Sequence, residues 1–168
     1  MKKAIHILLI ICLYLFISCT YDEECRKNRY VEMNVKFYKV TYNEVTKQYT
    51  TAPLTVDSLT VRGLRIDPNT GSETLVDSVL YNNKTTNTIS LPLSKFDNES
   101  AFVLSFKKTI DTIRIFHTNN EQYLSLECGC ITVHSIDTVL MTRHFLDSAK
   151  INVHNVNTTN AEHLRLYN

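Results

Sequence analysis

Apolar and polar residues alternate one by one along much of the chain. Between Val31 and Phe37 every second residue is apolar, and Glu32, Asn34 and Lys36 lie between them. The same period of two returns in residues 102–106, 112–115, 123–127 and 163–167. Alternation places one set of side chains on a buried face and the other toward water, as in half-buried strands. The pattern therefore predicts strands over these stretches.

Short polar clusters separate the alternating stretches and predict turns. They lie at residues 42–44, 67–71, 82–84, 97–99 and 118–120. Their Asn, Asp and Thr side chains turn the chain through hydrogen bonds to nearby backbone. No run has a convincing helical period; residues 141–150 come nearest, but equally suit a strand. About seven to nine short strands indicate an all-β fold, a single antiparallel β-sandwich of immunoglobulin-like type, with a small barrel as the alternative.

The N-terminal residues have a different pattern. Lys2 and Lys3 precede an unbroken apolar run from Ile7 to Ile17, and the small Ser18 follows it. This order of basic, apolar and small residues is typical of a secretory signal peptide. The run is also shorter than the roughly 20 residues that a membrane-spanning helix needs. We therefore expect a signal peptide over residues 1–18.

Ile17-Ser18-Cys19 resembles a bacterial lipobox, although Phe16 stands where Leu is usual. The resemblance implies cleavage before Cys19 and acylation of that cysteine by chains such as palmitate. Ordinary cleavage, which leaves Cys19 as a thiol, is the alternative. Residues 22–24 are acidic and resemble a surface-export signal of Bacteroidetes-type bacteria, or they form a solvated tether. The expected location is the bacterial outer membrane, on its periplasmic or cell-surface side.

These segments predict a simple domain organisation. A lipidated tether spans residues 19–29, and one β-sandwich domain spans residues 30–168. Removing residues 1–18 leaves 16 basic against 17 acidic side chains. No basic patch stands out, so the charge pattern gives no support to nucleic-acid binding. No motif implies a cofactor, and the expected contacts are the membrane, through the lipid, and an envelope protein or glycan.

Cys25, Cys128 and Cys130 remain after Cys12 is removed with the signal peptide and Cys19 is acylated. Disulfides are the default in an exported chain. The first interpretation pairs Cys25 with Cys128 or Cys130. Such a bond closes a loop of about 100 residues, and chain-entropy models give it about 4.7 kcal/mol as an upper value.

Two other interpretations of these cysteines stay open. Cys128 and Cys130 form a small, strained and easily reduced ring if Gly129 allows the bend. Alternatively, Cys128, Cys130 and His134 lie on one face of a strand and bind a metal with Cys25, although Cys-Gly-Cys is closer than the usual zinc spacing. The other histidines are His117, His144, His154 and His163; their scattered positions are typical of surface or hydrogen-bonded core residues.

A short tripeptide recurs with irregular spacing: Asp, then Ser or Thr, then a small or aliphatic residue. It occurs five times, more often than composition alone gives. A structural interpretation is a side-chain turn at a strand start. The tripeptide is also similar to the O-glycosylation motif that Bacteroidetes-type bacteria use on exported proteins. This resemblance implies candidate acceptors at Ser58, Ser78, Thr112, Thr138 and Ser148.

Several longer stretches together resemble one family. They are "CTYDEEC", "ISLPLSKF", "YLSLECGC", "TRHFLDS" and "NVNTTNAE". The combination is similar to an uncharacterised family of small Bacteroidetes cell-envelope lipoproteins with a Cys-Gly-Cys motif. That family carries a domain-of-unknown-function label, so it implies a location and no catalytic residues.

Enzyme signatures are missing from the sequence. There is no Gly-x-Ser-x-Gly elbow, no Gly-rich phosphate loop and no His-Glu-x-x-His motif. We therefore expect an envelope lipoprotein that is a non-catalytic binding or structural module. An exposed aromatic patch supports such a module, and its candidates are Tyr30, Tyr38, Tyr42 and Tyr49. The alternative is a thiol-redox or metal-handling protein that uses Cys128, Cys130 and His134.

Overall fold

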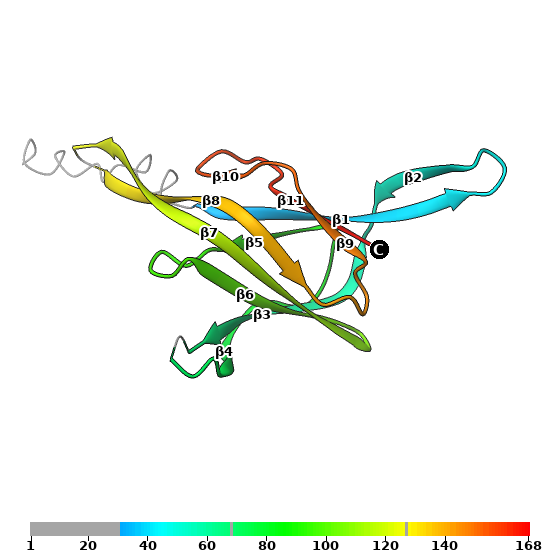
Figure 1. The fold of residues 1–168 in the computed structure, drawn as a ribbon, viewed down its shortest axis with the longest axis horizontal. Coiled ribbons are helices and arrows are strands. Elements are labelled where there is room, and N and C mark those ends of the chain that lie inside the picture. Colours follow the sequence, from blue (N-terminus) through cyan, green and yellow to red (C-terminus); the bar gives the residue numbers. More distant parts are fainter. Residues whose placement is uncertain (1–30, 68, 127) are drawn as a thin grey trace, which may run out of the picture.

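The computed structural model describes residues 31–67, 69–126 and 128–168, and these residues form two packed β-sheets (Figure 1). The first sheet, sheet A, contains β1 (Glu32–Asn43), β2 (Gln48–Pro53), β5 (Thr88–Pro92), β9 (Ser148–Ile151) and β11 (Leu164–Tyr167). The second sheet, sheet B, contains β3 (Val56–Ile66), β4 (Glu73–Thr86), β6 (Glu99–Phe106), β7 (Thr109–Ser125), β8 (Gly129–Met141) and β10 (Asn155–Val156).

Strand β1 organises sheet A, because it pairs with three other strands. The sheet order is β2-β1-β11-β9, and β5 pairs with the first part of β1. The pairing of β1 with β11 is parallel, whereas its pairings with β2 and β5 are antiparallel. In sheet B the order is β10-β8-β7-β6-β3-β4, and every pairing is antiparallel. A single parallel pair therefore joins the first described strand to the last.

The core lies between the inner faces of the two sheets. On β1 the alternation of the sequence buries Met33, Val35 and Phe37 completely. Phe37 meets Phe106 of β6 edge to face, with the ring centroids 6.3 Å apart. The other fully buried large side chains are aliphatic: Leu59, Ile89, Leu91, Leu104, Ile113, Ile115, Ile136, Leu146, Leu164 and Leu166. Burial of these side chains supplies the main driving force for folding.

The predicted β-sandwich is confirmed, and the alternative of a barrel is wrong, because the sheets stay separate. Two predicted turns are also wrong. Residues 82–84 lie inside β4, where Asn83 has a φ of 48° and the pairing with β3 shifts register. Residues 118–120 lie inside β7 and pair with β8. Residues 82–84, 118 and 120 are polar because they are exposed, and Asn119 binds buried polar groups, so polarity does not mark a turn in these strands.

A buried carboxylate holds the loop between β8 and β9 against the core. Asp111 accepts the backbone N–H groups of His144, Phe145 and Leu146 at 2.8, 2.8 and 2.9 Å. It also accepts the hydroxyl of Thr142 at 3.0 Å. Burial by itself raises the pKa of Asp111, but these donors outweigh it and the pKa lies below its ordinary value. The loop over residues 142–147 is thus fixed by one ionised side chain.

Replacing Leu104 with Ala will destabilise the domain by about 2–5 kcal/mol, because it leaves a cavity in a fully buried site. Denaturant unfolding of the full chain measures this change. Leu126→Ala is the matched control, since Leu126 is 95% exposed and its loss will change stability by less than about 0.5 kcal/mol. Equal effects of the two substitutions would contradict the packing described here.

Candidate functional site

Besides Asp111 and His163, the interior contains a buried cluster of polar side chains. It consists of Ser100 on β6, His117 and Asn119 on β7, and His134 on β8. Ser100, His117 and His134 are all buried, and the two imidazole rings meet edge to face with centroids 5.1 Å apart. Adjacent strands of sheet B bring these residues together, because β7 pairs with β6 on one side and β8 on the other.

The amide of Asn119 fixes the protons of this cluster. Its Nδ2 donates to the backbone carbonyl of Asp97 at 3.0 Å, so its Oδ1 is directed to the histidines. That oxygen lies 2.9 Å from Nδ1 of His117 and 2.7 Å from Nδ1 of His134. An amide oxygen only accepts hydrogen bonds, so both Nδ1 atoms carry the proton. One acceptor therefore holds two neutral histidines.

The hydroxyl of Ser100 and Nε2 of His117 also have partners within the protein. With its proton on Nδ1, His117 accepts the hydroxyl of Ser100 at Nε2, over 2.9 Å. The backbone N–H of Ser94 donates to the same hydroxyl oxygen at 2.8 Å. Serine, histidine and asparagine follow one another here as a nucleophile, base and orienting group do in acyl-transfer enzymes. No sequence motif indicated this order, since the residues come from different strands and irregular spacings.

Burial keeps both histidines of the cluster neutral. It lowers the pKa of His117, against smaller opposing effects of Asn119, Asp137 and Asp97. Burial also lowers the pKa of His134 to about 4, and the positive charges that His117 and Lys95 can carry act in the same direction. Protonation of either ring would place a charge in the interior. It would also turn the Nε2 atom of a ring that already donates from Nδ1 into a second hydrogen-bond donor.

A hollow of about 670 Å³ adjoins Ser100 and the loop before β6. This volume falls in the range of small-molecule pockets, which is about 300–1,000 Å³. Its acidic side chains already have partners: Asp97 accepts the hydroxyl of Ser94 at 2.9 Å, and Glu99 accepts Arg114 at 2.5 Å. Ser100 is only 7% exposed. The hollow thus has the size of a binding pocket but offers few unoccupied polar groups.

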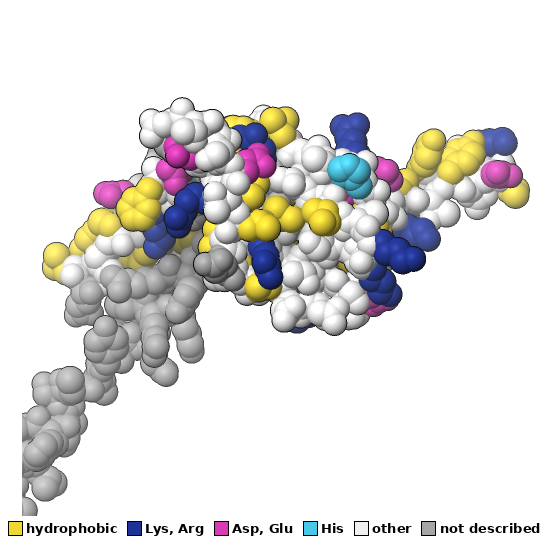
Figure 2. All heavy atoms as spheres, turned by 90° about the horizontal axis from the view of Figure 1, so that it is seen from below, with side chains coloured by type: hydrophobic (Ala, Val, Ile, Leu, Met, Phe, Trp, Pro, Cys, Tyr) yellow, Lys and Arg dark blue, Asp and Glu magenta, His cyan; other side chains and the backbone are white. Residues whose placement is uncertain are grey.

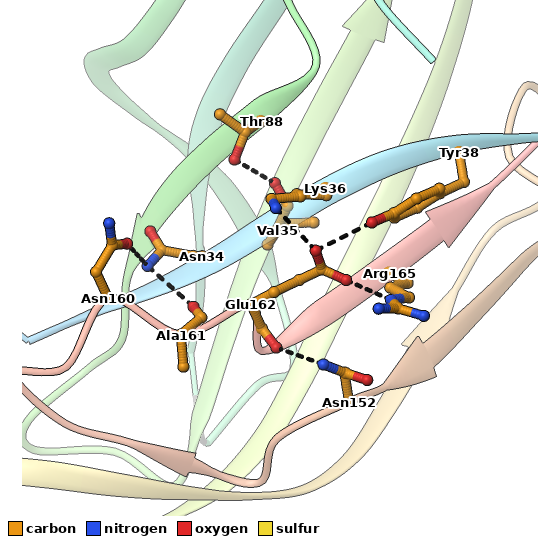
Figure 3. A network of polar contacts seen from close by, with 10 residues as sticks. All are labelled: Asn34, Val35, Lys36, Tyr38, Thr88, Asn152, Asn160, Ala161, Glu162 and Arg165. Carbon is orange, nitrogen blue, oxygen red and sulfur yellow. Dashed lines mark hydrogen bonds and ion pairs between the residues drawn. The ribbon is translucent and has the colours of Figure 1, made fainter. Parts of the chain in front are cut away.

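A second polar network lies on the outer face of sheet A (Figure 3). Glu162, just before β11, accepts Lys36 and Tyr38 of β1, each at 3.0 Å, and also pairs with Arg165. The guanidinium of Arg165 lies 5.3 Å from the Tyr38 ring centroid. Burial by itself raises the pKa of Glu162, but hydrogen bonds from Arg165, Lys36 and Tyr38 outweigh it and lower that pKa. The network ties β1 to β11 across their parallel pairing.

The outer end of β1 and the whole of β2 form a projecting hairpin, which we call the arm (residues 39–53). All its residues are exposed, and it extends beyond the sandwich at the end where β1 finishes (Figure 1). Tyr42 and Tyr49 are cross-strand partners with ring centroids 4.9 Å apart. Tyr49 is 74% exposed and Val45 at the tip is 91% exposed. Hydrophobic side chains gather on the arm in Figure 2.

The predicted aromatic candidates divide between the sandwich and the arm. Tyr42 and Tyr49 lie on the arm and are exposed. Tyr38 is half-buried, with its ring 5.8 Å from that of Tyr167 and its hydroxyl bound to Glu162. Tyr30 lies outside the described residues. The open aromatic surface thus consists of the arm tyrosines, while Tyr38 belongs to the packed outer face of sheet A.

Of the cysteines predicted to be bonded, lipidated or reactive, only Cys128 and Cys130 lie among the described residues. Cys130 carries a free, exposed thiol, so no bond joins it to Cys128. Cys128 is half-buried and does not titrate as a thiol. The predicted anchor Cys19 and the predicted partner Cys25 lie outside the described residues. The small ring between Cys128 and Cys130 does not form, although the chain turns at Gly129 with a φ of 70°.

His134 is directed to Asn119 and is buried, whereas Cys130 is exposed on the same strand. Residues 31–67, 69–126 and 128–168 contain no group of three or more His, Cys, Asp or Glu side chains placed to hold a metal ion. Of the other histidines, His117 and His163 are buried, and His144 and His154 are exposed. His163 accepts the backbone N–H of Asn34 at 2.9 Å, in a contact between β1 and the segment before β11.

The candidate glycosylation sites differ in accessibility. Ser78, Thr138 and Ser148 are exposed, whereas Ser58 and Thr112 are half-buried. Ser58 has a φ of 56° at an irregular point of the β3–β4 pairing. Modification of any of them stays a prediction, and the exposed three present the most accessible hydroxyl groups.

Comparison with known proteins gives one family. Residues 58–168 match the model of a family described as a family of unknown function, DUF6452. The chain belongs to this family. The match covers every described strand after β3 and most of β3 itself, but leaves out the arm. No curated protein and no solved structure matches the chain.

The stability of the DUF6452 domain will fall as the pH drops from about 6.5 toward 4. In this range the unfolded chain takes up a proton at His134 and the folded chain does not, so protonation favours unfolding. The full contribution of His134 is about 3 kcal/mol. Urea unfolding at a series of pH values measures it.

His134→Gln is the informative variant for this pH dependence, because it removes the titrating group. The variant will show a flatter pH profile between about 4 and 6.5 than the parent chain. His154→Gln is the control, since His154 is exposed and contacts no acidic side chain among the described residues. A profile that is unchanged by His134→Gln would contradict the assignment of a neutral, buried ring.

Proposed function

We propose that this protein is a membrane-anchored module of the bacterial envelope that acts by binding and not by catalysis. The observation that carries the proposal is the arm, which exposes Tyr42, Val45 and Tyr49 beyond the sandwich. Exposed apolar patches of this kind mark interaction sites. Tyrosine is also enriched in binding surfaces, since its ring is apolar and its hydroxyl makes hydrogen bonds.

The buried cluster supports the same proposal by its closed hydrogen bonding. The hydroxyl of Ser100 and both polar atoms of the Asn119 side chain have hydrogen-bond partners inside the protein. Ser100 is also almost fully buried. A catalytic serine needs access to substrate and donors placed for the developing oxyanion. Here the nearest backbone N–H, that of Ser94, is bound to the serine hydroxyl itself. The cluster is therefore better suited to fixing strands β6, β7 and β8.

Acylation of Cys19 would anchor the chain at the N-terminal end of the domain. Strand β1 leads directly from that end to the arm, so the arm lies at the end of the sandwich opposite the start of β1 (Figure 1). Residues 20–30 are long enough to span roughly 36 Å when extended. No helix among the described residues is long and apolar enough to cross a membrane. The proposed location is the outer membrane, with the arm directed away from the attachment point.

We further propose that Cys25 is bonded to Cys128. Cys128 is disulfide-bonded, and the thiol of Cys130 is free. Of the remaining cysteines, Cys12 lies in the predicted signal peptide and Cys19 is the predicted lipid site. The hairpin tip between β7 and β8 lies at the end of the molecule where β1 begins (Figure 1). Only five residues separate Cys25 from Val31, the first described residue, so the length of the chain allows such a bond. This bond leaves no dithiol for redox cycling, which argues against the thiol-redox alternative.

Non-reducing peptide mass mapping of protein from native membranes tests the anchor and the bond. We expect an acylated N-terminal peptide that begins at Cys19, and a peptide pair that joins Cys25 to Cys128. Cys130 will be alkylated without prior reduction. Cys19→Ala will release the protein from the membrane fraction, whereas Cys130→Ser will leave it there. An unmodified Cys19 in membrane-bound protein would contradict the lipid anchor.

The arm is tested in full-length protein with Cys19→Ala, which lacks the proposed lipid anchor, by measuring how much of it binds to purified outer membranes from cells without this protein. Replacing Tyr42 and Tyr49 together with Ser will weaken this binding at least about tenfold, since aromatic residues dominate contact energies. Tyr123→Ser is the matched control, because Tyr123 is 59% exposed on a different hairpin. Unchanged binding by the double variant would contradict the proposed role of the arm.

A further inference from the structure

The arm has a free edge whose direction follows from the hydrogen bonds at its base. On β1, Val40 donates its N–H to the carbonyl of Asn168, and Tyr38 accepts the N–H of Asn168. Even-numbered residues of β1 therefore face the C-terminal strand. Phe37 instead accepts the N–H of Leu54, so odd-numbered residues of β1 face β2. This parity continues along the arm, because the pairing of β1 with β2 has no register shift.

The parity fixes which backbone groups of β2 face outward. Thr50 is paired with Thr41, and Ala52 with Lys39, so their N–H and C=O groups face β1. The N–H and C=O groups of Tyr49 and Thr51 face away from it. Among the described strands β2 pairs only with β1, so these groups have no protein partner there. Pro53 has no N–H, and the open edge ends at that residue.

Several other sheet edges of the described chain are protected, whereas β2 is not, and the other open edge of the arm is only the short end of β1 beyond Val40. The N–H of Ser90 on β5 is capped by the hydroxyl of Tyr81 at 2.8 Å. Strand β4 is irregular, with several register shifts against β3. Strand β9 is short and carries Lys150, and β10 has only two residues. Residues 48–52 carry no charge and no bulge, although natural proteins protect exposed edges by these means.

We propose that β2 of a second copy of this chain pairs antiparallel with this edge, about a two-fold axis at Thr50. This register places Tyr49 opposite Thr51 of the second copy, and Thr51 opposite Tyr49 of that copy. Both pairs are hydrogen-bonded pairs, in which each residue gives its N–H and its C=O. Tyr49 and Thr51, whose backbone N–H and C=O groups face outward, are thus the residues that form hydrogen bonds in this dimer register. Pro53, which cannot donate, lies outside it.

The side chains are compatible with this register. Thr41, Thr50 and their two symmetry mates form a row of threonines across one face of the four-stranded ribbon. Cross-strand threonine pairs are favourable. Lys39 is paired with Ala52, and Ala52 faces Gln48 of the second copy, so no like charges meet. The pairing is self-complementary, as an interface with two-fold symmetry requires.

The opposite face of the ribbon carries the aromatic residues of both copies. Tyr42 and Tyr49 share this face with Val40 and Thr51, because cross-strand partners lie on the same side of a sheet. The dimer uses backbone groups at the edge and leaves this face open. It therefore doubles the aromatic surface to which we assigned envelope binding, and the inference deepens that proposed function. A two-stranded ribbon is also marginal alone, whereas four strands support one another.

Engineered cross-linking tests the register directly. Residues that face each other on the two-fold axis form a non-hydrogen-bonded pair, with Cα atoms about 4.5 Å apart, within the range of a disulfide. In full-length protein with Cys130→Ser, the added substitution Thr50→Cys will give a covalent dimer on mild oxidation. Thr41→Cys in the same background is the matched control and will stay monomeric, because it lies one strand away from the axis. Equal cross-linking of both variants, or of neither, would overturn the register.

The association is measured by analytical ultracentrifugation of the full chain in detergent, over a series of concentrations. We expect a reversible dimer that Thr51→Pro weakens by about tenfold or more, because proline removes an outward N–H. Proline is tolerated at an edge position that bonds nothing inside the protein, so the fold will persist and circular dichroism will confirm it. Thr41→Val is the control and will dimerise as the parent chain does.

A parent chain that stays monomeric at every concentration and is not cross-linked through Thr50→Cys would overturn the dimer. That result is distinct from failure of the proposed function. If the chain is monomeric but the paired Tyr42 and Tyr49 substitutions still abolish binding to membranes, the arm binds an envelope component by itself. If the dimer forms and those substitutions change nothing, the dimer stands and the binding role is wrong.

Discussion

The alternation of side chains along β1 is the constraint on which the architecture depends. Its inward side chains, Met33, Val35 and Phe37, fill the centre of the core, and its backbone holds β5, β2 and β11. A period of two continues past Tyr38, but its apolar side chains are at the even positions 40 and 42 and lie on the face opposite the core side chains, in solvent. The arm is therefore a continuation of a core strand into solvent, and the rigidity of the sandwich fixes its direction. A binding surface on such a ribbon is positioned without a specialised loop.

The sequence was sufficient to predict the fold class because its period-two pattern reflects burial, and burial decides which sheet faces meet. Met33, Val35 and Phe37, like Leu164 and Leu166, were predicted inward and are inward. The pattern was insufficient where strands leave the core. Residues 118–120 are polar because they face solvent or the buried cluster, so composition indicated a turn in the middle of β7. The pairing of a strand depends on the backbone of the strands beside it, and the local sequence of one strand carries no information about them.

The buried cluster was not predicted, and its residues explain why. His117 and His134 were considered separately, Asn119 only as part of a predicted turn, and Ser100 not as a site residue. They meet only because β6, β7 and β8 lie side by side in one register. The exposure of Tyr42 and Tyr49 on the arm, by contrast, is consistent with the aromatic candidates chosen from sequence. Candidates on one local hairpin could be found from sequence. A site assembled from three strands could not, because the strand register that brings its residues together must be known first.

The parallel pairing of β1 with β11 also has a consequence for the order of folding. Asn34 contacts His163 across 129 positions of sequence. Strand β1 therefore acquires β11 as its neighbour only when the C-terminal end of the chain is available. Long-range pairing of this kind slows folding, because the chain must close a large loop before the contacts repay its entropy. During synthesis the backbone edge of β1 that pairs with β11 thus stays unpaired until the C-terminal strand has been made. In the exported chain that we propose, this pair would close only after the whole polypeptide has crossed the membrane.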